Sequence, residues 1–115
     1  MVDRGFTMTL FNDRERAFEQ IFVHDEEARF RALAKRNKRL GQWAAAQIGM
    51  TGENADAYVS EISRSVVAAV VDESLVDKLR VDFEAGGVSQ SDDQIRAKMS
   101  ELMATAISQV RSSSW

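Results

Sequence analysis

The sequence of 115 residues contains no proline. At an average usage of roughly 5%, a chain of this length would hold about five or six prolines. Proline lacks a backbone N–H group and breaks helix interiors, so its absence permits long, unbroken helices. The length is that of one domain with one hydrophobic core. We therefore expect a single helical domain.

The first predicted helix spans residues 12–48. Asn12 is a suitable N-cap, and apolar side chains then recur at spacings of three, four and seven residues until Gly49, a suitable stop. Gly41 lies inside this helix and costs roughly 1 kcal/mol relative to alanine. Close contact with another helix, or a bend, would explain its presence.

The apolar stripe of this helix is interrupted near its middle. Asp25 and Arg29 occupy positions that would be apolar if the whole helix packed on a core. We therefore expect the N-terminal part to project from the domain. The expected organisation is a disordered extension (1–11), a projecting helical arm (12–30), a bundle (31–111) and a frayed tail (112–115).

Three further amphipathic segments follow. Their expected starts are Gly52 or Glu53 after the cap Thr51, Asp72 or Ser74, and the residues after the cap Ser91 or Asp92. The second helix is predicted to reach Val71, although the β-branched run 66–71 leaves a strand as a minority interpretation. Gly86–Gly87 should end the third. Their expected core side chains are Ala55, Val59, Ile62, Val66, Ala69, Val70, Leu75, Leu79, Phe83, Ile95, Met99, Leu102, Met103, Ala106 and Val110. The predicted fold is an all-α, four-helix bundle whose long first helix projects or is disordered at its N-terminal part.

Charge and composition exclude several classes of protein. The formal charge is −3, from 15 basic and 18 acidic residues, whereas a general nucleic-acid binder needs a basic excess. The absence of cysteine excludes disulfide scaffolds and thiolate metal sites. No apolar run approaches the roughly 18 residues of a membrane span, and no signal peptide is visible. We expect a soluble, intracellular protein without membrane insertion.

The charge is unevenly distributed along the chain. Residues 1–40 carry +2, from nine basic and seven acidic side chains, and residues 41–115 carry −5, from six basic and eleven acidic side chains. Four cations cluster in the first part: Lys35, Arg36, Lys38 and Arg39. Such runs are usually solvated helix faces, but a phosphate of ATP or ADP is an alternative ligand for them.

No catalytic constellation is visible. His24 is the single histidine, and neither a nucleophile nor converging metal ligands accompany it. Gly49 and Gly52 lack the lysine and spacing of a phosphate-binding loop. Paired carboxylates fit exposed helix faces. We expect neither an enzyme nor a bound metal or cofactor.

Residues 8–30 form an unusual segment. A helix over this stretch would place Phe11, Phe18 and Phe22 on one side, with charged residues around the rest. A helix that binds in a partner's groove typically has such an apolar ridge with charged flanks. An ordinary bundle helix fits the periodicity equally well, and the interruption at Asp25 favours the projecting arm.

Three sequence blocks carry a resemblance to a known family. They are FNDRERAFE from Phe11 to Glu19, the HDEE block that follows Phe22, and RNKRLGQWAA from Arg36 to Ala45. In combination they resemble the ATPase inhibitor ζ subunits of the F-type ATP synthase of alphaproteobacteria. The resemblance is closest before residue 50. Residues 1–7 precede the Met8 at which family members begin.

The resemblance implies a four-helix bundle whose N-terminal segment inserts at an α/β catalytic interface of the ATPase head and blocks ATP hydrolysis. The implied inhibitory residues are Phe11, Asp13, Arg14, Glu15, Phe18 and Glu19, and we add Arg16 and Phe22 from the ridge and its charged flanks. The implied partners are the α, β and γ subunits, and the implied location is cytoplasmic, peripheral at the inner membrane. A nucleotide-binding protein and a helical adaptor are the alternatives.

Overall fold

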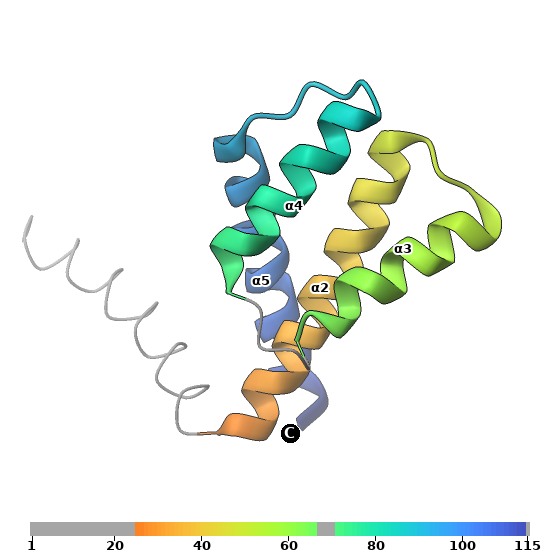
Figure 1. Cartoon of the computed structure of the whole chain (residues 1–115). Helices are drawn as coiled ribbons and strands as arrows, with labels where there is room; N and C mark the ends of the chain where they lie inside the picture. The colour runs from red at the N-terminus through yellow and green to blue at the C-terminus, as the bar shows by residue number, and fades with distance from the viewer. Residues whose placement is uncertain (1–24, 67–70, 115) are drawn as a thin grey trace, which may run out of the picture.

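The computed structural model describes residues 25–66 and 71–114. They form four helices: α2 (Glu26–Ile48), α3 (Gly52–Arg64), α4 (Asp72–Ala85) and α5 (Asp92–Ser114) (Figure 1). Within these ranges there is no strand. The all-α, four-helix prediction is therefore confirmed. Within the same ranges, no helix combines the length and apolar character needed to cross a membrane.

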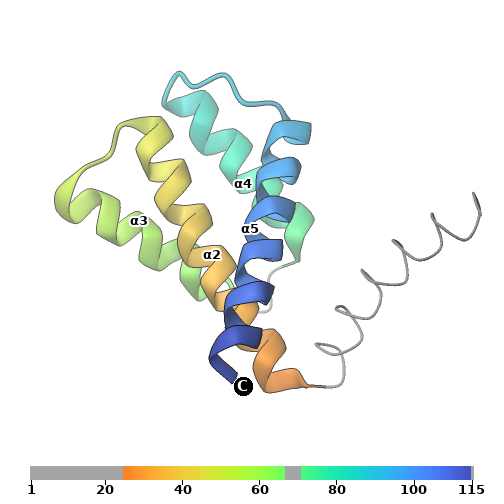
Figure 2. The same ribbon diagram turned by 180° about the vertical axis from the view of Figure 1, so that it is seen from behind.

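Helix α2 is the centre of the arrangement. It contacts α3, α4 and α5, and α4 also packs against α5. Figures 1 and 2 show α2 and α5 side by side and antiparallel, so that the start of α2 lies beside the end of α5. Helix α3 folds back along α2 after a short turn. The start of α2, to which the predicted arm is attached, is therefore held by the last turns of α5.

Helix α2 begins at Glu26, not at Asn12. Asp25 is its N-cap, with extended backbone angles (φ −115°, ψ 91°), and the Asp25 carboxylate accepts a hydrogen bond of 3.0 Å from the Ala28 N–H. Glu26 and Glu27 in the first turn complement the positive end of the helix dipole. The prediction of one continuous helix over residues 12–48 is wrong at Asp25, because this residue satisfies the free N–H groups of a new helix start.

Several helix ends follow the prediction. Gly49 ends α2 in a left-handed conformation (φ 87°), and its N–H and that of Met50 both bond to the Ala45 carbonyl. Ser91 caps α5 in a reciprocal pair with Gln94, in which each side chain accepts a hydrogen bond from the other residue's backbone N–H. These ends depend on local chemistry and are therefore readable from sequence.

Two helix ends differ from the prediction. Helix α3 stops at Arg64, and Val71, where it was expected to end, has an extended backbone (ψ 153°) as the N-cap of α4. The β-branched residues that follow Ser65 in the sequence are weak helix formers. Helix α5 continues to Ser114, into the tail predicted at 112–115, of which Trp115 lies outside the described residues.

The main core lies where α2, α3, α4 and the first half of α5 meet. Its fully buried side chains include Leu40 of α2, Ile62 of α3, Phe83 of α4 and Ile95 of α5. Most of the described side chains that the apolar spacing assigned to the core are buried or half-buried, and Tyr58, which it did not assign, is buried as well. A second, smaller cluster joins α2 to the end of α5. It contains Ala28, Ala32, Ala106 and Val110.

Gly41 is explained by close helix contact. A Cβ atom built on it would lie 3.0 Å from the Val59 Cα and 3.3 Å from the Ile62 Cβ. The nearer atom is backbone, so it cannot turn aside as a side chain can. Glycine at this position therefore sets how closely α2 and α3 approach.

Replacing Gly41 by alanine should destabilise the domain by about 1 kcal/mol, because overpacking typically costs 1–3 kcal/mol and outweighs the gain of about 1 kcal/mol in helix propensity. Urea unfolding followed by circular dichroism measures the change. The exchange at an exposed position of the same helix, Ala46→Gly, reports the propensity effect alone. A more stable Gly41→Ala protein would contradict the close contact.

Candidate partner-binding surface

All eight residues predicted to enter the partner lie outside the described residues. They are Phe11, Asp13, Arg14, Glu15, Arg16, Phe18, Glu19 and Phe22. His24 and the extension predicted at 1–11 lie outside as well. The structure does show how the bundle begins at Asp25, and this defines the base from which the predicted arm departs.

The base of the arm is a small alanine-rich contact. Ala28 and Ala32 of α2 are buried against Ala106 and Val110 of α5. Because these side chains are small, the two helices can lie close together, and their backbones hold one another in place. Bundle packing thus begins at Ala28, three residues before the boundary expected at residue 31.

Phe30 is the large apolar side chain exposed at this base. Its side chain is 49% exposed, and Glu26, Glu27 and Arg29 around it are exposed as well. The surface therefore combines an aromatic ring with charged flanks, as the arm sequence does. Phe30 was not among the predicted site residues, although it is the fourth phenylalanine of the segment 8–30.

The basic cluster is split among different environments. Arg36 is only 3% exposed and forms two hydrogen bonds, of 2.9 and 3.0 Å, with the carboxylate of Asp72 at the start of α4. Its Nε also donates to the Asn37 Oδ1 at 2.8 Å. Arg39 donates to Gln109 of α5 at 2.9 Å. Both arginines hold other helices against α2.

The two lysines of the cluster are different. Lys35 and Lys38 are exposed, and neither makes an ion pair or hydrogen bond within residues 25–66 and 71–114. The four cations do not form one surface, because Arg36 and Arg39 are engaged with Asp72 and Gln109. Nucleotide binding by this cluster stays a prediction, with two of its four proposed ligands already occupied.

A charged cluster joins α3 to α4. The Tyr58 hydroxyl donates to Asp82 at 2.7 Å, and the Lys78 ammonium lies 2.8 Å from Glu61 and 3.2 Å from Asp82. Burial, reinforced by the hydrogen bond to Asp82 and the nearby carboxylates, raises the pKa of Tyr58. Burial opposes the charge of Lys78, but its bonds to Glu61 and Asp82 outweigh burial and raise its pKa. Both shifts favour a neutral Tyr58 and a charged Lys78. The cluster therefore links α3 to α4 through a hydrogen bond and ion pairs.

Two further findings concern chemistry. Across the described portion of the chain, no three histidine, cysteine, aspartate or glutamate residues come together as a metal site would require. Every buried side-chain polar atom of the described residues has a hydrogen-bond partner.

The chain matches a known protein family. No curated protein matches the chain. The family model described as ATPase inhibitor subunit zeta matches residues 8–109, which cover both the predicted arm and the bundle. The chain therefore belongs to the ATPase inhibitor subunit zeta family.

Proposed function

We propose that this protein inhibits ATP hydrolysis by the head of the F-type ATP synthase. The N-terminal arm inserts at an α/β catalytic interface, and the bundle stays outside against the same subunits. The observation that supports the proposal most is the family match, because it begins at residue 8 and so includes the whole phenylalanine ridge. The partners in this proposal are the α, β and γ subunits. The protein is then cytoplasmic and peripheral at the inner membrane.

The bundle provides a firm base for such an arm. Its two core clusters are built from residues between Ala28 and Val110. In this proposal, the ridge of Phe11, Phe18 and Phe22 enters an apolar cleft of the partner. An interface that opens and closes in each catalytic cycle is blocked by a wedge that itself does no chemistry. The inhibitor therefore needs no catalytic residue.

The charged residues of the arm are proposed to orient it in the cleft. Asp13, Arg14, Glu15, Arg16 and Glu19 flank the ridge and are proposed to pair with charges on the walls of the cleft. Such pairs contribute more to register and association rate than to affinity. The exposed Phe30, with Glu26 and Glu27 beside it, continues the same pattern onto the described surface, and we place it at the edge of the interface.

The double variant Phe18→Ala/Phe22→Ala tests the insertion. Aromatic anchors in buried interface pockets typically contribute 2 kcal/mol or more each, so the loss of two should raise the concentration needed for half-inhibition about 1000-fold. The measurement is the ATP hydrolysis rate of purified ATPase head as a function of inhibitor concentration.

A matched control removes an exposed apolar side chain elsewhere. Val81 of α4 is 58% exposed, and Val81→Ala should inhibit as the wild type does. If the double variant also inhibits like the wild type, the ridge does not enter the interface. If the wild-type protein neither binds nor inhibits the head, the proposed function is wrong. That result would favour the alternative of a helical adaptor.

A further inference from the structure

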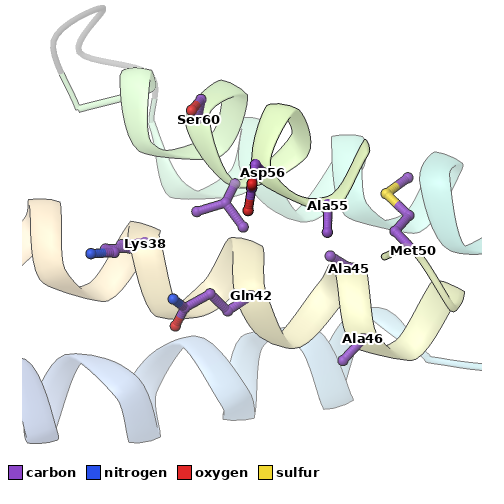
Figure 3. Close-up of a pocket in the computed structure, with 9 residues that line it drawn as sticks. Lys38, Gln42, Ala45, Ala46, Met50, Ala55, Asp56 and Ser60 are labelled. Carbon is purple, nitrogen blue, oxygen red and sulfur yellow. The ribbon is translucent and has the colours of Figure 1, made fainter. Parts of the chain in front are cut away.

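A groove of about 390 Å³ runs between α2 and α3. Figure 3 shows Lys38 at one end and Met50 at the other, with Ser60 on the α3 side. Small apolar side chains lie between them, including Ala45 and Val59. A groove with so many small side chains fits a narrow apolar edge, such as one side of a helix or an extended peptide.

Two contacts fix the spacing of the two helices that form the groove. Gly41 lets the backbones of α2 and α3 approach closely, because a Cβ atom built on it would lie only 3.0 Å from the Val59 Cα. Ile62, which is fully buried, anchors α3 to the main core beside this contact. The groove is therefore a preformed feature, which lowers the entropic cost of binding.

Three exposed cations lie at or near the end of the groove at Lys38. Lys35 lies one turn before Lys38 on α2, and Arg64 lies one turn beyond Ser60 on α3; all three cations are exposed. None of them makes an ion pair or hydrogen bond within the described ranges. The basic side chains of α4 and α5 that pair with carboxylates are Lys78, Arg80, Arg96 and Lys98.

Charge is unevenly distributed along the groove. Asp56 is the acidic residue among its lining side chains, and it lies between the two ends in Figure 3. Lys38 lines one end, and Lys35 and Arg64 lie beyond this end on α2 and α3, outside the lining. A segment that places carboxylates at this end and small apolar side chains along the floor complements both properties.

We propose that this groove docks an acidic, apolar-edged segment of the ATPase head, at a place separate from the arm. The inference rests on the proposed function, because that function supplies the partner. Two attachment points on one chain raise the overall affinity by effective concentration, without any new contact at the catalytic interface. The groove thereby adds affinity to that of the arm, and the arm alone blocks hydrolysis.

The test compares two double variants that change the net charge equally. Lys35→Gln/Lys38→Gln removes two cations at the groove, and Ser100→Glu/Ser108→Glu adds two anions at exposed positions of α5. For the groove variant we expect about tenfold weaker binding to the head at low salt, because charges at an interface rim act mainly through electrostatic attraction. The loss should shrink at high salt, where such attraction is screened. At saturating concentration its inhibition should equal that of the wild type. The α5 variant should bind as the wild type does.

The outcomes separate this inference from the proposed function. If the wild type does not bind the head, the proposed function fails. If the wild type binds and inhibits but both variants match it, or both weaken equally, only the groove assignment fails. A photo-crosslinking residue at the rim position Ser60 of the full-length protein identifies the occupant. A crosslink to an acidic segment of the head supports the inference, and a crosslink to residues 1–24 or to a second copy overturns it.

Discussion

Removing residues 1–24 will abolish inhibition of ATP hydrolysis and leave the four described helices folded. The two core clusters use side chains between Ala28 and Val110, and the deletion retains the Asp25 cap that begins α2. The whole proposed ridge is lost, so at least about a 1000-fold loss of potency is expected from its aromatic anchors. Hydrolysis assays on the ATPase head measure inhibition, and circular dichroism with thermal unfolding measures the fold.

The position of the cut decides how clearly the result can be interpreted. A truncate beginning at Leu33 would also remove Asp25, Ala28 and Ala32, and with them half of the second core cluster. Such a protein would lose stability together with the arm. A deletion of residues 1–7 alone is the control, because it stops short of the family match. If the 1–24 deletion inhibits as well as this control, the arm is not the inhibitory element.

The helix number and several helix ends could be predicted because their causes are local. Gly49 and Ser91 act through hydrogen bonds within a few residues, and each pattern is complete in the sequence. The start of α2 was missed although Asp25 is an equally good cap. Asn12 and Asp25 both have the right chemistry, and an apolar stripe alone does not determine which of two caps begins a helix.

The burial of Arg36 could not be predicted from the run of cations around it. Arg36 follows Ala32 and precedes Leu40 at spacings of four, so periodicity does place it on the core side of α2. Charge argued for solvent instead. Its partner, Asp72, is 36 residues away, and only tertiary packing brings the two together.

The candidate site also has one part that was predicted from the sequence and one part that was not. The arm residues were named from a sequence resemblance, and they stay a prediction because they lie outside the described residues. The groove was not predicted at all. Its floor comes from Ala45 of α2 and Val59 of α3, which are separated in sequence and meet because α3 folds back along α2 at Gly41. No local pattern carries that information.

The core variant Phe83→Ala is expected to have the largest effect on stability. Phe83 is fully buried in the last turn of α4, and its ring meets that of Trp43 edge to face, with 5.4 Å between centroids and 87° between planes. The substitution removes apolar burial, leaves a cavity and breaks the ring pair, at a cost of about 4 kcal/mol. Domains of this size are stable by roughly 5–15 kcal/mol, so about a quarter or more of the free energy of unfolding would be lost.

Urea unfolding followed by circular dichroism measures this loss, and Val81→Ala on the same helix is the control. Val81 is 58% exposed, so its truncation should change the free energy of unfolding by less than about 0.5 kcal/mol. A loss below about 1 kcal/mol for Phe83→Ala would mean that α4 is not held by this contact. Below its unfolding transition, the Phe83→Ala protein should still inhibit, because the proposed wedge and the core are separate parts of the chain. Loss of inhibition by a fully folded Phe83→Ala protein would instead place the end of α4 in the interface.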